Sequence, residues 1–454
     1  MTKRLPYKFL IAGFFYAIIL GYFWIGMSWF SPILVTNLPI NLSVDELCTF
    51  FKGNDISAYC TVGRDVVLKG YTTFTQSMPE FRLWPLAPFL NFSLATFLIG
   101  TTKSIFPFFA IYSYLLWLSV FIVVGYFAAK RLGAIGYLFP VLILILPELN
   151  RFLLVLGLYG GDGYGSAYFI LGFALLLFLK KTSLIISIIS GVLLAVSAYY
   201  RSSNETILLI MFLAFICAIF YACLRERLKN DVSFKRTLSS EWKVYKYLMI
   251  AILIALICTT PWRAFTYKVE RRVAWTRNFD FEVHSVWYSL EEAAPWFIES
   301  GGALACKFSP QVCSRFHKQG LNNITKTEKL TELINTIKQH PFAWTAAKSE
   351  IFAIQWLGPY YKERSILLTS YRLFLLLVFF LYPIYIGTRF LFVKTNGDIK
   401  RVVLLGSILV MSIVMILLVH IEPRYLYLSK ILAILYVLDI IALYKYTKNN
   451  KAIL

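Results

Sequence analysis

The residues best placed to do chemistry are Asp45 and Glu46, an adjacent acidic pair a short distance past an apolar run at residues 9–30. Acids are scarce in this chain, which has 24 Asp and Glu against 45 Lys and Arg. A carboxylate here could act as a general base that takes a proton from an attacking hydroxyl, an effect of about 10²–10⁴-fold in rate. The structural alternative is a capping box, because Ser43 precedes Glu46 by the spacing that such a box requires.

Arginines at the ends of apolar runs form a second group of candidates. Arg201, Arg263 and Arg424 each lie at the end of a predicted membrane span that faces the same side as Asp45. If the spans form a bundle, the guanidinium groups could meet at one outward-facing cavity and stabilise the negative charge of a phosphate leaving group. Snorkelling of each side chain to the interface is the structural alternative.

A third cluster lies between the last two predicted spans and consists of His420, Glu422, Arg424 and Tyr425. Ionisable groups at the mouth of a helix bundle are commonly functional. The structural alternative is a tight turn made by Pro423.

Asp162 lies among glycines in residues 160–165. Glycines there allow close approach of the backbone, but they also fit a flexible turn. The chain has no phosphate loop, nucleotide fingerprint or zinc-type spacing of Cys and His. With 4 histidines in all, a histidine-based metal site is not expected and no cofactor is assigned, while a role for a divalent metal stays open.

Membrane-spanning helices must position these residues. Hydrophobic residues make up 59% of the 454 residues, and many apolar runs reach the roughly 18–23 residues that cross a bilayer as a helix. Continuous apolar runs favour helices over a barrel, whose strands would alternate. The predicted fold is all-α and polytopic, with about ten transmembrane helices and two large periplasmic loops that contain helices. The predicted spans are residues 9–30, 105–129, 134–147, 166–179, 183–199, 205–224, 247–260, 367–388, 402–420 and 425–444, with an interfacial helix at 83–100 and helical segments within 327–356.

The distribution of charge predicts the topology. The formal net charge is +21, which in a soluble chain would suggest nucleic acid. Much of it lies in short loops between spans, among them a basic loop at 225–246, so the positive-inside rule explains it and no nucleic-acid partner is expected. Both termini are then cytoplasmic, and the long loops 31–104 and 262–365 are on the other side.

This topology divides the chain into three parts. They are an N-terminal transmembrane module at 1–261 that includes the first outer loop, a periplasmic loop domain at 262–366, and C-terminal transmembrane helices at 367–454.

The cysteines provide an independent check of this topology. Cys48 and Cys60 lie in the first outer loop, and Cys306 and Cys313 lie in the second. Two local pairs on the exported side fit disulfides in an oxidising compartment, with chance placement as the alternative.

Four stretches carry a resemblance to a known family. They are Asp45 and Glu46 with the flanking Val44 and Phe50, residues 82–86 leading through 97–100 to 131–133, residues 260–263, and residues 420–425. In this order they resemble the acidic motif, the loop helix and second span, the Pro-Trp motif and the Arg-Tyr motif of the GT-C superfamily of integral-membrane glycosyltransferases. The chain looks closest to the protein-mannosyltransferase and aminoarabinose-transferase branch of bacterial envelopes. It is more loosely similar to phage-type transferases that decorate O-antigen.

The resemblance implies an inverting glycosyltransferase of the bacterial inner membrane. Such an enzyme moves a sugar from a polyprenyl-phosphate donor to a glycolipid or glycan acceptor, such as lipopolysaccharide or O-antigen, on the periplasmic face of the bilayer. Asp45 would be the base, with Glu46 supporting it or substituting for it. The donor phosphate would be held by Arg201, Arg263 and Arg424, with Asp162, His420, Glu422 and Tyr425 in supporting positions.

Two other functions remain open from the sequence. An O-antigen polymerase shares many spans and outer arginines, but it needs no acidic motif after the first span. A lipid-linked-oligosaccharide flippase or transporter predicts internal repeats and charges at mid-membrane depth. The chain shows no convincing repeat, and its charges cluster at span ends.

Overall fold

A computed structural model of the chain describes residues 5–30, 41–50, 55–70, 86–146, 159–179, 183–230, 232–270, 326–357, 366–392, 398–418, 421 and 423–451. Helices make up nearly all of these residues, and the described chain contains no strand beyond one isolated bridge between Ser43 and Ser104. The helices are α1 (Leu5–Phe30), α3 (Val44–Phe50), α4 (Asp55–Lys69), α6 (Leu86–Ile99), α7 (Phe106–Leu132), η2 (Gly133–Leu138), α8 (Val141–Leu144), α11 (Gly161–Phe178), α12 (Leu184–Tyr200), α13 (Ser202–Asn230), α14 (Phe234–Glu270), α18 (Lys326–Gln339), α19 (Pro341–Leu357), α20 (Ile366–Phe392), α21 (Asp398–Leu418) and α22 (Pro423–Lys451).

Among the described residues, 7 helices are long and apolar enough to cross a membrane. They lie in α7 with η2, α11, α13, α14, α20, α21 and α22, and shorter apolar helices occur in α1, α6 and α12. Many of their side chains are apolar and exposed, as expected for surfaces that face lipid. The chain is therefore an all-helical, multi-pass membrane protein, while the total of about ten spans stays a prediction.

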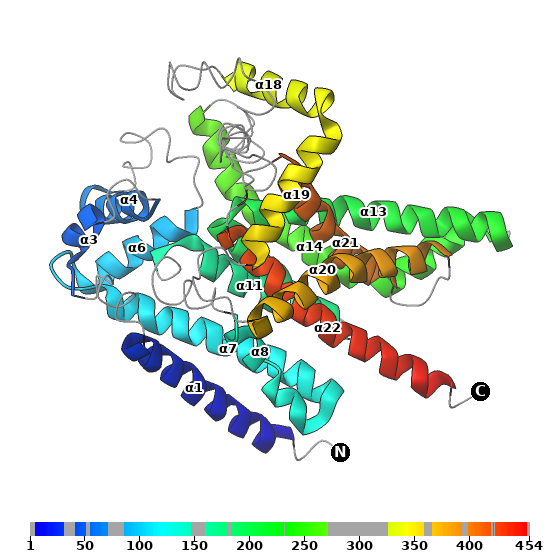
Figure 1. Ribbon diagram of the computed structural model, residues 1–454, viewed down its shortest axis with the longest axis horizontal. Coiled ribbons are helices and arrows are strands. Elements are labelled where there is room, and N and C mark those ends of the chain that lie inside the picture. The colour runs from blue at the N-terminus through cyan, green and yellow to red at the C-terminus, as the bar shows by residue number, and fades with distance from the viewer. Residues whose placement is uncertain are drawn as a thin grey trace.

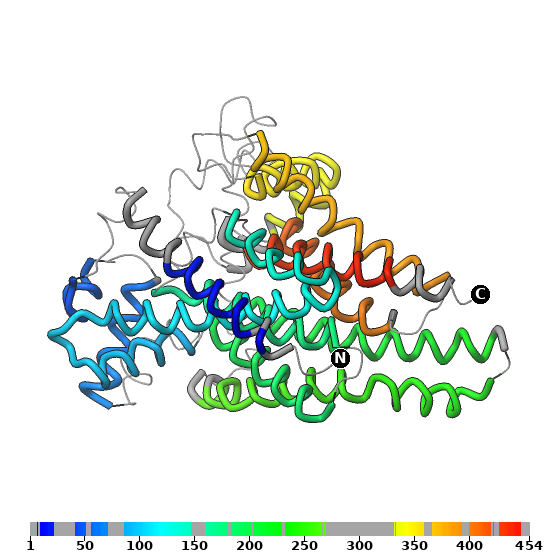
Figure 2. Tube along the Cα trace, turned by 90° about the horizontal axis from the view of Figure 1, so that it is seen from below, coloured from blue at the N-terminus to red at the C-terminus, as the bar shows by residue number. Residues whose placement is uncertain are grey.

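Most of the predicted spans match helices closely, and the departures are at residues 134–147 and at the span predicted at 247–260. Residues 134–147 were expected to form one span, but their described part consists of the short helices η2 and α8. The basic segment 225–246 is also largely helical, because α13 continues to Asn230 and α14 begins at Phe234 (Figure 2, green tubes). The helical segments expected within 327–356 are confirmed as α18 and α19.

The span predicted at 247–260 is part of a longer helix, because α14 begins at Phe234 and continues through Pro261 to Glu270. Pro261 lacks the backbone N–H that would donate to the Ile257 carbonyl four residues earlier, and side chains donate to the carbonyls on either side of Ile257. Here Thr259 Oγ1 and Thr260 Oγ1 donate to the Leu256 carbonyl at 2.8 Å and 3.1 Å. The hydroxyl of Tyr199, from α12, donates to the nearby Cys258 carbonyl at 2.7 Å.

The flexible turn expected at residues 160–165 is also wrong. Gly160 is the N-cap of α11, and the following residues form its first turns. The glycines allow close packing instead: a Cβ on Gly161 would lie 2.6 Å from the Tyr200 carbonyl oxygen and 3.1 Å from Pro88 Cγ. Helices α11, α12 and α6 therefore meet at this point.

Hydrogen bonds to backbone carbonyls gather several helix ends at one end of the bundle, here called the basic end. Arg225 of α13 donates to the carbonyls of Phe390 and Phe392 at 3.0 Å each. Lys400 of α21 donates to the Leu179 carbonyl at 2.9 Å, just past α11. Lys445 of α22 donates to the carbonyl of Arg131, at the end of α7. In Figure 1 the end of α22 lies far from α3 and α4.

A buried ion pair joins α20, α21 and α22 near the basic end. Arg401 donates through Nε and an Nη atom to the two Asp439 oxygens at 2.8 Å and 2.9 Å. The Tyr382 hydroxyl also donates to Asp439, at 2.8 Å. Because Asp439 is only 1% exposed, these donors replace the hydrogen bonds that water would give to its carboxylate.

Replacing Asp439 with Asn should lower the free energy of unfolding by about 3 kcal/mol, because Arg401 loses its counter-charge in a buried site. Thermal unfolding in detergent, followed by the reaction of a thiol dye with the buried Cys223, measures the change. The double change Arg401→Leu with Asp439→Leu should recover part of the loss, and Arg227→Gln on an exposed side chain is the control. An unchanged unfolding midpoint in Asp439→Asn would contradict the assigned role.

Candidate functional site

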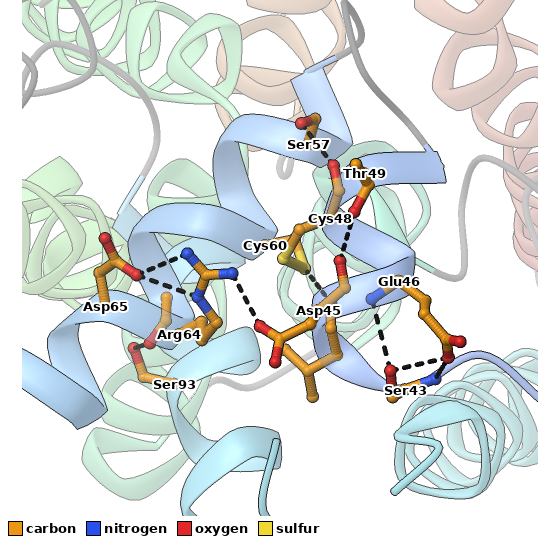
Figure 3. The surroundings of a disulfide bond; sticks show 12 residues. Ser43, Asp45, Glu46, Cys48, Thr49, Ser57, Cys60, Arg64, Asp65 and Ser93 are labelled. Atoms are coloured by element: carbon orange, nitrogen blue, oxygen red, sulfur yellow. Dashed lines mark hydrogen bonds and ion pairs between the residues drawn. A yellow bond between two sulfur atoms is a disulfide. The ribbon is translucent and has the colours of Figure 1, made fainter. Parts of the chain in front are cut away.

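Asp45 and Glu46 lie in the first turn of α3, which packs against α4. A disulfide between Cys48 and Cys60 joins the two helices. The Ser57 hydroxyl donates to the Cys48 carbonyl at 2.7 Å and adds a second connection. The two short helices are thus held as one unit, here called the α3–α4 hairpin (Figure 3).

Glu46 forms the capping box that its spacing from Ser43 predicts. Its Oε2 accepts from the Ser43 backbone N–H at 2.8 Å and from the Ser43 hydroxyl at 2.7 Å. The Glu46 backbone N–H faces the Ser43 Oγ at 3.4 Å in return. These donations, led by that of the hydroxyl, hold the pKa of Glu46 below its ordinary value. Glu46 is therefore occupied at the start of α3 and is a poor proton acceptor in this arrangement.

Asp45 points the other way, toward Arg64 of α4 (Figure 3). Its Oδ1 accepts from Arg64 Nη1 at 2.8 Å, and its side chain is 58% exposed. Among the described residues no hydrogen bond or ion pair involves Asp45 Oδ2. One oxygen is thus oriented by Arg64, while the other makes no hydrogen bond within the described part of the chain.

Arg64 is itself held by Asp65, which accepts from its Nε at 3.0 Å and from Nη2 at 2.8 Å. Lys69 donates to the second Asp65 oxygen at 2.9 Å. Partial burial alone would raise the pKa of Asp65, but the hydrogen bonds from Lys69 and Arg64 outweigh it and lower that pKa. Asp65 therefore stays ionised and fixes the guanidinium that orients Asp45.

Helix α6 connects the hairpin to the bundle. Gly63 of α4 packs so closely on α6 that an added Cβ would lie 2.5 Å from Phe92 Cβ, and the Ser93 hydroxyl donates to the Gly63 carbonyl at 3.0 Å. On the other side of α6, Asn91 accepts from the Tyr200 hydroxyl at 2.9 Å. The hairpin is therefore tied through α6 to the end of α12, where Arg201 follows.

Tyrosine side chains fill the contact between α6, α7, α11 and α12. The Tyr112 hydroxyl is bonded to the hydroxyls of Tyr168 and Tyr200 at 2.8 Å and 2.9 Å. The Tyr164 ring stacks on Tyr112 with centroids 4.8 Å apart. This cluster fixes Tyr200, and with it the backbone of the following Arg201.

Arg201 is the C-cap residue of α12 and forms an ion pair with Asp162, in the first turn of α11, at 3.2 Å. Their side chains are 13% and 23% exposed. Asp162 and Arg201, assigned separately from the sequence, are thus brought together. This end of the bundle, opposite the basic end, is here called the Arg201 end.

Arg263 lies inside α14 and is bonded to Glu205, in the first turn of α13. Its Nε donates to one Glu205 oxygen at 2.8 Å, and an Nη atom contacts the other. The Glu205 side chain is 6% exposed. Sequence reasoning missed Glu205, although an acid at the edge of a long apolar segment is a signal of a paired or functional group.

Several predicted site residues cannot be placed. His420, Glu422, Cys306 and Cys313 lie outside the described residues, as do the side chains of Arg424 and Tyr425 at the start of α22. In the part of the chain that the structure describes, no three His, Cys, Asp or Glu side chains converge to hold a metal ion.

Fold and site together define a multi-pass membrane protein with paired arginines at one end of its helix bundle. No family model, characterised protein or solved structure matches this chain. The resemblance to the GT-C superfamily therefore depends on the sequence motifs and not on a measured relationship.

Removing the disulfide by replacing Cys48 and Cys60 with Ser should loosen the hairpin. A disulfide that closes a loop of this length contributes about 3 kcal/mol to the free energy of unfolding by the loop-entropy model. Trypsin should then cut faster at Arg64 and Lys69 in the folded, detergent-solubilised protein, as peptide mass spectrometry would measure. Cys217→Ser, at an exposed free thiol, is the matched control. Equal cleavage rates in the two variants would show that packing alone holds the hairpin.

Proposed function

We propose that this chain is an inverting glycosyltransferase that moves a sugar from a polyprenyl-phosphate donor to an acceptor hydroxyl of lipopolysaccharide, O-antigen or another envelope glycan. The proposed setting is the periplasmic face of a bacterial inner membrane. The observation that carries it is the exposed Asp45 carboxylate, which has one oxygen oriented by Arg64, on a hairpin tied to the Arg201 end. The four GT-C-like motifs supply the reaction class.

The reaction needs a base and a cationic site. The acceptor oxygen attacks the anomeric carbon and forms the new glycosidic bond, while the bond from that carbon to the phosphate oxygen breaks. The electron pair of that bond leaves with the polyprenyl phosphate, and the hydroxyl proton passes to the base. Positively charged groups near the leaving phosphate stabilise the charge that develops on it.

Asp45 supports the role of base better than Glu46 does. Glu46 Oε2 accepts two hydrogen bonds from Ser43, whereas Asp45 Oδ2 is open among the described residues. A hydroxyl could therefore approach Asp45 without breaking the cap of α3. Glu46 is then proposed to support Asp45 by fixing the helix start.

Arg201 and Arg263 are the proposed phosphate ligands, with Arg424 as a third. Asp162 and Glu205 hold the first two guanidinium groups in position at the Arg201 end. A guanidinium group has five N–H donors, and each carboxylate accepts from some of the donors of its arginine. A guanidinium group matches a phosphate in charge and in hydrogen-bonding geometry, which suits a phosphate that arrives from the bilayer.

Asp45→Asn should reduce the rate of sugar transfer by about 10²–10⁴-fold, because the Asn amide cannot take the proton from the hydroxyl of the acceptor. The assay uses purified protein in nanodiscs, a panel of polyprenyl-phosphate hexoses and pentoses, and a lipopolysaccharide acceptor. Glu46→Gln should stay near the activity of the unaltered protein, because a Gln still completes a capping box.

The control for folding is the tryptic stability of the hairpin, which both variants should retain. Full activity in Asp45→Asn and in Glu46→Gln would remove both residues as bases. Loss in Glu46→Gln alone would assign the proton transfer to Glu46. Formation of long O-antigen chains without transfer of single sugars would favour the polymerase.

Arg201→Gln should weaken the binding of sugar-free polyprenyl phosphate by about tenfold or more. This is the effect expected from the loss of one hydrogen bond to a charged group. Binding to protein in nanodiscs, measured with radiolabelled lipid, tests this.

Because Arg201→Gln also leaves Asp162 without its counter-charge, the double variant with Asp162→Asn is needed. Continued weak binding in the double variant supports a direct phosphate contact. Recovery of binding would mean that Arg201 acts through the fold alone. Arg227→Gln at the basic end is the control for a general loss of positive charge.

A further inference from the structure

A long apolar groove runs between α20 and α22 on the outside of the bundle. Its volume is about 640 Å³. The segment from Phe374 to Arg389 follows α20 for about 22 Å, at 1.5 Å per residue. The lining residues are Phe374, Leu377, Val378, Leu381, Tyr382, Tyr385, Arg389, Ile440, Leu443 and Tyr444.

The groove has a fixed floor rather than a chance gap between helices. Tyr382 is buried, its ring stacks with Tyr385 at 6.5 Å, and it contacts Tyr436 at 6.1 Å. Its hydroxyl is held by Asp439, which Arg401 holds in turn. The ion pair that joins α20, α21 and α22 thus also sets the depth of the groove.

Charge is confined to one end of the groove. Arg389 is the one charged residue in its lining, where it lies one turn beyond Tyr385 on α20 and at the same end as Tyr444. Arg225 adds a second cation close by, because it binds the carbonyls of Phe390 and Phe392. No carboxylate is among the lining residues.

We infer that this groove binds one anionic phospholipid, with an acyl chain along α20 and the headgroup phosphate at Arg389. The apolar length suits a hydrocarbon chain, since it exceeds half of the roughly 30 Å hydrocarbon core. The cation at the basic end matches a phosphate at the headgroup level, where each basic residue contributes to the retention of anionic lipids. This site is separate from the Arg201 end and does not depend on the proposed glycosyl transfer.

The test is native mass spectrometry of the full chain with phosphatidylglycerol or phosphatidylcholine of identical acyl chains. The unaltered protein should retain one phosphatidylglycerol in preference to phosphatidylcholine. Arg389→Gln should reduce this retention about fivefold. Leu377→Trp should abolish it by filling the groove.

Two control variants match these changes. Arg227→Gln removes an exposed cation at the basic end outside the groove. Leu115→Trp adds the same bulk on α7 at a residue of similar exposure, 54% against 51% for Leu377. Neither control should change retention.

Several outcomes would overturn the inference. They are equal retention of the two lipids, unchanged retention in Leu377→Trp, preference for polyprenyl phosphate over phosphatidylglycerol, and a protein dimer that Leu377→Trp dissociates. The last would make the groove an interface between two copies of the chain.

Discussion

The hydrogen bond from the Tyr200 hydroxyl to Asn91 joins the parts of the candidate site. On one side, α6 carries the α3–α4 hairpin and therefore Asp45. On the other side, Tyr200 is followed directly by Arg201 and is held by the hydroxyl of Tyr112. Because these hydroxyls are largely buried, leaving any of them without a partner would cost free energy. The position of the hairpin relative to the bundle thus depends on a small polar cluster in an apolar setting.

Arginines are paired with carboxylates at both ends of the molecule. At the Arg201 end, Asp162 and Glu205 hold two arginines, and at the basic end Asp439 holds Arg401. In a low-dielectric environment an arginine needs either a carboxylate or backbone carbonyls, and Arg225 uses the latter. The three pairs differ in setting, because Asp439 lies inside the bundle while the other carboxylates lie in the first turns of helices. An acid in a first turn also benefits from the helix dipole.

The sequence predicted most of the helices and little of their contacts. Apolar run lengths located the spans, and the spacing of Ser43 and Glu46 predicted a capping box that the structure contains. The continuation of α14 through Pro261 was not predicted, because the sequence alone does not show that Thr259, Thr260 and Tyr199 bond carbonyls next to that of Ile257. The glycines around Asp162 fit both close packing and a turn, and the sequence could not decide between them because the packing partner, Tyr200, is distant in sequence. The sequence analysis also missed the pairing of Glu205 with Arg263. Neither the pattern of apolar runs nor the spacing of charged residues indicates which helices are neighbours.

The capping box changes how the acidic pair should be interpreted. Adjacent carboxylates on a helix point in different directions, since successive residues are about 100° apart around the axis. One can therefore serve the helix while the other serves a substrate, and the pair need not act together. Here Glu46 turns back to Ser43, and Asp45 turns toward α4, where Arg64 holds one of its oxygens. The ion pair with Arg64 thus sets how the Asp45 carboxylate is turned, while the disulfide and α6 set where it lies.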